Sequence, residues 1–280
     1  MWASCRVPRA ILLVGFVAAL QGCAAATVNY ADPSGPRYAA AGPSRSGDPD
    51  TLRIVTFNVK WGRHVNEVLA LLRQEGPLRD PDVLLLQEMD EAGTRVIAET
   101  LGLGYVYYPA TLHPVTRRDF GNAVLSRFPI EEDRKVVLPH VARIRHTIRA
   151  AVGATLRVGT RRLRVYSVHI ATFVNNGPRA RRAQLTAVLA DADAYPTVLI
   201  GGDFNSETVP EIALAWGYSW PTRHLPHTTS FWTMDHMLLK GLELANTSAV
   251  GLVREVHGAS DHKPVWARVV LQNEQAASSH

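Results

Sequence analysis

The organisation of the chain follows from one stretch, Val198-Leu199-Ile200-Gly201-Gly202-Asp203-Phe204-Asn205-Ser206-Glu207. Its first three residues are apolar and predict a buried strand. The Gly201-Gly202 pair predicts a turn, which leaves the carboxylate of Asp203 at the edge of the core. In an extended backbone the side chains of Asp203 and Asn205 point to the same side, while Phe204 points into the core. An Asx turn at the end of an ordinary strand explains the same residues.

The composition is typical of a soluble globular protein. The chain has 280 residues, of which 46% are hydrophobic and 20% are charged, which is enough for one sizeable core. Its formal net charge of +5 falls to +3 without Arg6 and Arg9, which precede the first apolar run. A charge of this size does not by itself indicate a nucleic-acid-binding protein.

Residues 1–22 predict a signal peptide. Arg6 and Arg9 precede an apolar run over residues 10–20, which is too short to span a bilayer but typical of a signal-peptide core. The following Leu20-Gln21-Gly22-Cys23 resembles the bacterial lipobox, in which the cysteine is lipidated and becomes the new N-terminus. A plain secretory signal cut nearby, with a secreted product, is the alternative.

The two cysteines of the chain are Cys5 and Cys23. Cleavage before Cys23 removes Cys5, so the processed protein has no intrachain disulfide, and the remaining cysteine suits lipidation. We therefore expect a cell-envelope lipoprotein that is anchored to a membrane through Cys23 without spanning it. Residues 23–50 are interpreted as the lipidated cysteine and a flexible tether rich in Ala, Gly, Pro and Ser, with ends on the order of 30 Å apart. The polar residues 272–280 predict a disordered tail.

Residues 51–271 are predicted to form one domain, because they contain no internal repeat and no second linker. Apolar runs typical of strands outnumber amphipathic patterns typical of helices, and they mix hairpins with crossovers. This favours an α/β sandwich over a simple doubly wound sheet. The expected strands are 52–57, 82–87, 123–125, 147–156, 163–168, 197–200, 234–239 and 265–271, and the expected helices are 64–74, 90–101 and 178–192.

Polar residues follow or open most of these strands. Each has an ordinary structural explanation when it is taken alone, such as a turn cap, a helix N-terminal charge or a satisfied core histidine. If they converge, they provide oxygen ligands for a hard cation and imidazoles for a reacting oxyanion. The residues are Asn58, Glu88, His169, Asp203, Asn205, Asp235, Asp261 and His262.

The chain also resembles a known family over this domain. Its segments resemble, in the same order, the motifs of the endonuclease/exonuclease/phosphatase superfamily, which includes deoxyribonuclease I, neutral sphingomyelinases and inositol-polyphosphate 5-phosphatases. The resemblance implies a four-layer α/β sandwich, in which two packed mixed sheets are flanked by helices. It also implies Mg²⁺-dependent cleavage of a phosphoester bond at the rim of the sandwich, with Mn²⁺ as a possible substitute. The segments are residues 57–59, 86–88, 121–127, 167–169, 202–205, 234–236 and 260–265.

The resemblance assigns a metal site and a nucleophile. Glu88 would be the main metal ligand, with Asn58 and Asp261 close to the ion. Because Mg²⁺ keeps several waters, one carboxylate and a few neighbouring groups suffice to hold it. Asp203 would orient or deprotonate the attacking water, and Asn205 would hold a phosphate oxygen.

The resemblance also assigns two imidazoles. His262 would contact the phosphate and stabilise its growing charge, with Asp235 fixing the ring, and His169 would lie near the leaving or non-bridging oxygen. Asn122 matches a family position near the site and would have a supporting role.

The substrate stays open between several classes. Arg143, Arg145, Arg149 and the arginines of 157–164 and 179–182 form either a groove that tracks phosphates or a solvated face. Lipid anchoring argues against chromosomal repair and favours extracellular nucleic acid or a phospholipid head group as the phosphodiester, acted on by a monomer. The alternatives are a phosphomonoesterase on an inositol-phosphate-like substrate and a non-catalytic lipoprotein that binds phosphorylated ligands.

Overall fold

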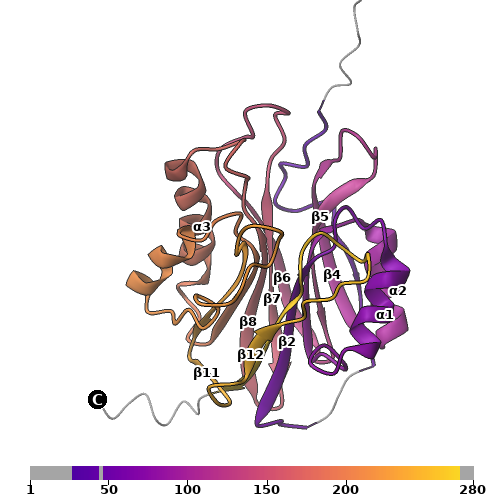
Figure 1. Cartoon of the computed structure of the whole chain (residues 1–280), viewed down its shortest axis with the longest axis vertical. Coiled ribbons are helices and arrows are strands. Elements are labelled where there is room, and N and C mark those ends of the chain that lie inside the picture. Colours follow the sequence, from indigo (N-terminus) through magenta and orange to yellow (C-terminus); the bar gives the residue numbers. More distant parts are fainter. Residues whose placement is uncertain (1–26, 44–46, 272–280) are drawn as a thin grey trace, which may run out of the picture.

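The computed structural model describes residues 27–43 and 47–271. The predicted signal peptide, the predicted lipidation of Cys23 and the predicted tail over 272–280 lie outside the described residues. Two mixed sheets pack face to face, and helices cover the outer face of each (Figure 1). This arrangement confirms the predicted four-layer α/β sandwich.

The first sheet combines strands from both ends of the domain. In it β2 and β3 run parallel, and the other pairs run antiparallel. Its spatial order is β1 (Tyr38–Ala40), β4 (Gly104–Leu112), β5 (Asp119–Ser126), β3 (Val83–Met89), β2 (Thr51–Asn58), β13 (Val265–Leu271) and β11 (Leu242–Leu244), with β12 (Val250–Leu252) also paired to β13.

The second sheet comes from the middle of the chain. In it β8 and β9 run parallel, and the other pairs run antiparallel. Its order is β10 (Asp235–Lys240), β9 (Val198–Asp203), β8 (Arg161–His169), β7 (Ala150–Val158) and β6 (Ile130–Val137).

Each parallel pair needs a crossover connection, and a helix supplies it. Helix α1 (Val65–Gln74) joins β2 to β3, and α3 (Pro178–Ala192) joins β8 to β9. Helix α2 (Glu91–Leu101) follows β3 and begins where the Asp90 side chain accepts a hydrogen bond from the Gly93 amide. Helices α1 and α2 cover the first sheet, and α3 with a 3₁₀ helix (Val209–Trp216) covers the second.

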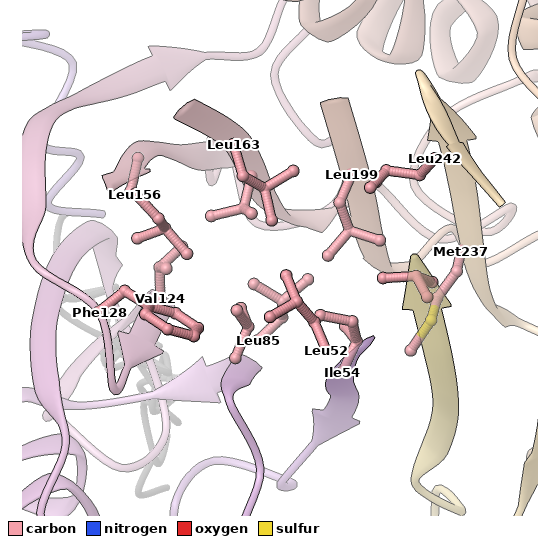
Figure 2. Close-up of a cluster of buried hydrophobic side chains, with 14 of the residues drawn as sticks. Leu52, Ile54, Leu85, Val124, Phe128, Leu156, Leu163, Leu199, Met237 and Leu242 are labelled. Carbon is pink, nitrogen blue, oxygen red and sulfur yellow. The ribbon is translucent and has the colours of Figure 1, made fainter. Parts of the chain in front are cut away.

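The main core fills the space between the two sheets. Figure 2 shows Leu85 and Val124 of the first sheet facing Leu163 and Leu199 of the second. Alternate residues such as Leu84 face the helices instead, so the central strands are buried on both faces. This is why they appear in the sequence as nearly continuous apolar runs.

Buried polar side chains join the sheets next to this core. Gln87 Nε2 donates to Ser167 Oγ over 2.9 Å, and Ser167 Oγ donates to the Leu86 carbonyl over 2.9 Å. Asn122 Nδ2 donates to the carbonyls of Ala150 and Ser167 over 2.7 and 3.3 Å. These bonds satisfy polar groups that would otherwise be costly to bury, and they fix how one sheet lies on the other.

The predicted turn at Gly201-Gly202 is wrong, because both glycines lie within β9. A Cβ added to Gly201 would come within 2.7 Å of Leu85 Cδ1 on the facing sheet. A Cβ added to Gly202 would collide with the carbonyl oxygen of Val168, and the φ of Gly202 is +154°. The glycines therefore allow close approach between strands rather than a change of direction.

The predicted flexible tether is wrong for residues 27–43. Strand β1 pairs with β4, and Asn29 forms an isolated bridge with Thr111. The Lys135 ammonium also donates to the carbonyls of Asp32 and Gly35 over 3.1 and 2.8 Å. A segment with few apolar side chains still has backbone donors and acceptors, and here these pair with an exposed sheet edge.

Strands β4 and β6 were not predicted from the sequence. β4 contains Pro109 beside a register shift, which weakens its strand pattern. β6 is an edge strand that carries a polar run, Glu131 to Lys135.

No helix among the described residues is long and apolar enough to cross a membrane.

The replacement Gly202→Ala is expected to lower the free energy of unfolding by about 3 kcal/mol, because the new Cβ meets the Val168 carbonyl in an unfavourable backbone conformation. Gly76→Ala is the matched control, since its Cβ has no neighbour within 4 Å, and it should change stability by less than about 0.5 kcal/mol. Urea unfolding measures both. Equal midpoints for the two variants would contradict the close strand approach.

Candidate active site

The predicted polar residues gather at one end of the sandwich. Asn58 ends β2, His169 ends β8 and Asp203 ends β9, so the carboxyl ends of both parallel pairs meet there. In the register of the second sheet, Asp203 lies opposite both His169 and Asp235. The convergence that the sequence pattern predicts therefore exists in the structure.

A bulge in β3 aims Glu88 at this end. Leu84, Leu86 and Met89 all pack in the helix-side core, so the alternation of side chains slips by one residue after Leu86. Glu88 has a φ of 59°, which is unfavourable for a residue with a Cβ. The bulge thereby turns the Glu88 carboxylate away from the helix-side core, where regular alternation would have placed it.

The amide of Asn58 joins carboxylates from the two sheets. Asn58 Nδ2 donates to Glu88 Oε1 over 3.3 Å and to Asp203 Oδ2 over 3.0 Å. The other Glu88 oxygen accepts from the Trp61 backbone amide over 3.1 Å. The Ser260 hydroxyl donates to the Asn58 carbonyl over 2.7 Å, which brings the β12–β13 connection to the same place.

His169 is buried beside a cation. Arg149 Nη1 lies 3.1 Å from His169 Nδ1, and because a guanidinium can only donate, Nδ1 accepts and the proton lies on Nε2. Burial, followed by the charges of Arg149 and His262, holds the pKa of His169 well below its ordinary value. His169 is thus a neutral imidazole whose Nε2 lies 3.5 Å from Asp203 and 3.9 Å from Glu88.

His262 is positively charged, whereas His169 is neutral. Its Nδ1 donates to Asp235 Oδ2 over 2.8 Å, and its Nε2 lies 3.9 Å from Asp203 Oδ2. Burial lowers the pKa of His262, but the carboxylates of Asp235 and Asp203 outweigh burial and raise it to about 10. His262 is therefore protonated at neutral pH, and Asp235 fixes the orientation of its ring.

Asp203 and Asn205 form an Asx turn within the site. The Asn205 amide donates to Asp203 Oδ1 over 2.8 Å, and Asn205 Nδ2 donates to Oδ2 over 3.2 Å. The expectation of an extended backbone here is wrong, because Asn205 has a φ of 46°. Burial raises the pKa of Asp203, against the opposing charge of His262. The Asx turn and the polar cluster, which the sequence left as alternative explanations, are the same structure.

The acidic groups suit a divalent cation. Glu88 and Asp203 are largely buried, no arginine or lysine forms an ion pair with either among the described residues, and burial raises the pKa of both. A second grouping, Asp203, Asp235 and His262, has ligand atoms within 4.8 Å of one another. Its imidazole already binds Asp235, so Glu88 with its neighbours fits a hard, oxygen-seeking ion better.

Two predicted residues lie apart from the buried cluster. The Asp261 side chain is 56% exposed and pairs with Lys60 Nζ at 3.0 Å, which places it at the outer edge of the site. Asn122 is buried with its amide directed to Ala150 and Ser167, so it holds the two sheets together behind the site and does not line it.

A cavity of about 320 Å³ opens beside Glu88. Its walls include Trp61, His113 and Phe120, whose rings form a series of contacts that ends on His169. The sequence analysis placed Arg149 among arginines of either a groove that tracks phosphates or a solvated face. In the structure Arg149 lines this cavity and binds His169. Arg149 stands as a single charged residue between Ile148 and the apolar residues that begin β7, and this pattern could have identified it as a buried site residue from the sequence.

A comparison with protein-family models matches residues 55–262 to the Endonuclease/Exonuclease/phosphatase family. The chain belongs to this family. The match spans every residue of the predicted site and confirms the resemblance read from the motifs. Members of the family are phosphoester hydrolases, and they are generally dependent on a divalent metal.

Solved structures share the fold. The chain is similar to an endonuclease/exonuclease/phosphatase from Bacteroides vulgatus (TM-score 0.66, 13% identity, covering 80% of this chain and 100% of that chain). It is similar to the human Nocturnin catalytic domain with bound sulfate (TM-score 0.64, 17% identity, covering 84% of this chain and 96% of that chain). It is also similar to D. rerio TDP2 in complex with a single-strand DNA product (TM-score 0.61, 15% identity, covering 79% of this chain and 99% of that chain). No curated protein sequence matches the chain.

Metal-free protein is expected to lose stability as the pH rises from 6.5 to 10. The folded state raises the pKa of His262 above its ordinary value, so the proton stabilises the fold below pH 6.5 and this contribution disappears as the pH passes through 10. Urea unfolding in chelator should show a loss of more than about 1.4 kcal/mol, the equivalent of one pKa unit.

His262→Gln is the control for this experiment, because its side chain does not titrate. It should lack this part of the pH dependence while keeping the contribution of the other groups. The same pH dependence in wild type and His262→Gln would show that His262 is not held protonated by Asp235 and Asp203.

Proposed function

We propose that the protein is a Mg²⁺-dependent phosphodiesterase that cleaves its substrate with an activated water. The proposal rests on the position of two carboxylates from different sheets, Glu88 and Asp203, which both accept a hydrogen bond from the Asn58 amide. Two imidazoles lie near these carboxylates, neutral His169 and protonated His262. Such a site can neutralise a phosphate, activate a nucleophile and stabilise the charge that develops.

Glu88, with Asn58 and Asp261 beside it, would hold Mg²⁺, or Mn²⁺ in its place. When bound, the ion offsets the negative charge of the phosphodiester and lowers the pKa of a coordinated water. The bulge at Glu88 and the bond from the Trp61 amide keep the carboxylate in place before substrate binds.

Asp203 would act as the general base for water. A useful base has a pKa near the working pH, and burial shifts the pKa of Asp203 upward in that direction. Three donors, from Asn58 Nδ2, the Asn205 amide and Asn205 Nδ2, hold its carboxylate in one orientation. Asn205 thus acts by positioning Asp203. Its Nδ2 donates to the Ile170 carbonyl over 3.0 Å and to Asp203 Oδ2 over 3.2 Å, so both of its N–H groups are used and the expected contact with a phosphate oxygen would require one of these bonds to break.

The two histidines would bind the phosphate in different ways. Protonated His262 places positive charge beside Asp203 and can donate from Nε2 to a phosphate oxygen as negative charge grows. Neutral His169 can donate only from Nε2, because its Nδ1 is occupied by Arg149. Asp235 and Arg149 therefore set the orientation and protonation of the two rings.

The family and two of the structural neighbours support a phosphoester substrate. Sulfate has the shape and charge of a phosphate group, and the Nocturnin structure contains it. The TDP2 structure contains a single-strand DNA product. The lipobox-like Leu20-Gln21-Gly22-Cys23 supports a cell-envelope location, with secretion as the alternative, so that extracellular nucleic acid or a phospholipid head group is the proposed source of the bond.

Purified protein is expected to hydrolyse a phosphodiester in a panel of DNA, RNA, phospholipid head groups and inositol phosphates, and to lose this activity in chelator until Mg²⁺ is restored. His262→Ala should lower kcat about 100-fold or more, because charge stabilisation on the phosphate is lost. His224→Ala, which removes an exposed histidine, is the matched control and should keep wild-type kcat.

Three outcomes of this panel would count against the proposal. Activity in chelator would exclude the metal role, and wild-type kcat for His262→Ala would exclude the proposed site. Hydrolysis of a phosphomonoester reporter in preference to the diester would reassign the protein as a phosphomonoesterase.

A further inference from the structure

Exposed apolar side chains gather on the loops around the active site. The rim, as we define it, consists of seven such residues on four loops, and each is about half exposed or more. Outside these four loops, the exposed large apolar residues among those described are Val28, Tyr38, Val96 and Leu214, and their exposed fractions are only 36–43%. The rim residues are Val115 (58%), Val141 (49%), Ile144 (62%), Phe173 (62%), Val174 (56%), Phe231 (74%) and Trp232 (50%).

Three of the rim loops line the cavity beside Glu88, and two of these are hydrogen-bonded to each other. Val115 lines the cavity beside Glu88, together with Arg145 and Thr172, the neighbours of Ile144 and Phe173 in the sequence. The 138–149 and 170–177 loops are joined by hydrogen bonds of 3.3 Å, from the Arg143 amide to the Asn175 carbonyl and from the Asn176 side chain to the Val141 carbonyl.

The fourth loop contacts the segment that carries His262. It carries Phe231 and Trp232 and is held next to His262, because the Lys263 amide donates to the Thr228 carbonyl over 2.7 Å. The rim therefore adjoins both the cavity beside Glu88 and the segment that carries His262.

Two of the rim loops, 113–118 and 138–149, contain arginines, and the other two contain no lysine or arginine. Residues 113–118, 138–149, 170–177 and 226–234 contain no aspartate or glutamate. Arg117, Arg143 and Arg145 are exposed, and none of the three forms an ion pair within the part of the chain that the structure describes. Arg118 of the 113–118 loop pairs with Asp90, and away from the rim Arg157 and Arg162 pair with Glu131. Apolar tips among unpaired arginines match the acyl region and the anionic head groups of a bilayer.

The beginning of the described chain lies at the same end of the molecule. Thr27 Oγ1 donates to the Arg145 carbonyl and Asn29 Nδ2 donates to the His146 carbonyl, each over 2.7 Å. Figure 1 shows the described chain starting at the end of the sandwich where these loops project. Cys23 precedes Thr27 by four residues, which span at most about 14 Å. A lipid on Cys23 would hold the rim against the membrane rather than hold the domain away from it.

We propose that the rim is a docking surface for an anionic lipid bilayer, with the mouth of the active site facing the head groups. Isoleucine, valine and phenylalanine tips gain free energy by leaving water for acyl chains, and the unpaired arginines gain from anionic head groups. Nucleic acid would engage the arginines but would leave the aliphatic tips in water. Docking does not depend on the proposed chemistry, since it requires none of the catalytic residues.

The test measures the membrane depth of single spin labels on the full chain in vesicles. Ile144→Cys, Phe173→Cys and Phe231→Cys carry labels on the rim, and Val96→Cys and Leu214→Cys are controls on other faces, all in a Cys5→Ser, Cys23→Ser background. In vesicles that contain phosphatidylglycerol, the rim labels should be accessible to oxygen and shielded from a water-soluble nickel reagent. The control labels should stay accessible to nickel, and circular dichroism checks that every variant is folded.

Two further comparisons complete the test: vesicles of different lipid composition, and single-stranded DNA in place of vesicles. The shielding of the rim labels from nickel should increase at least about threefold when phosphatidylglycerol is added to phosphatidylcholine vesicles, because the surface potential attracts the rim arginines. Rim labels as accessible to nickel as the controls at every composition would overturn the proposal. Immobilisation of the rim labels by single-stranded DNA but not by vesicles would overturn it in favour of a nucleic-acid surface. Since hydrolysis is not measured, failure here leaves the proposed function standing.

Discussion

The side-chain amide of Asn58 is the contact on which the rest of the site depends. It donates to Glu88 from one sheet and to Asp203 from the other, so one residue sets the separation of two buried carboxylates. Without a shared donor, two carboxylates at this depth would repel each other and be costly to bury. The nearby bonds between Gln87, Ser167 and Leu86 hold the sheets in the register that this contact requires.

The packed core allows unfavourable backbone conformations at the site. Glu88 and Asn205 both have positive φ values, which cost free energy and persist only where the surroundings determine them. Leucines and valines that are fully buried between the sheets surround these strand ends and provide that rigidity. The site is thus organised before a metal or substrate binds, and little reorganisation is needed during the reaction.

The sequence predicted an α/β sandwich from its pattern of strands and helices, and its resemblance to the family implied the four layers and the common site of Asn58, Glu88, His169, Asp203 and His262. It did not predict three-dimensional features that leave no periodic signal. Gly201 and Gly202 suggested a turn, since a close strand contact and a turn both select glycine. Residues 27–43 looked unstructured because their order comes from backbone pairing with a distant edge. The role of Arg149 depends on where β7 meets β8, which local composition does not encode.

The most direct test of this account is anomalous diffraction from crystals of the protein grown with Mn²⁺. A strong anomalous peak is expected in contact with the Glu88 carboxylate, in the space bounded by Asn58 and Asp203. A peak held by residues away from this mouth, or no peak at a Mn²⁺ concentration that supports full activity, would contradict the claim that the two sheets together build one metal-dependent phosphoester site.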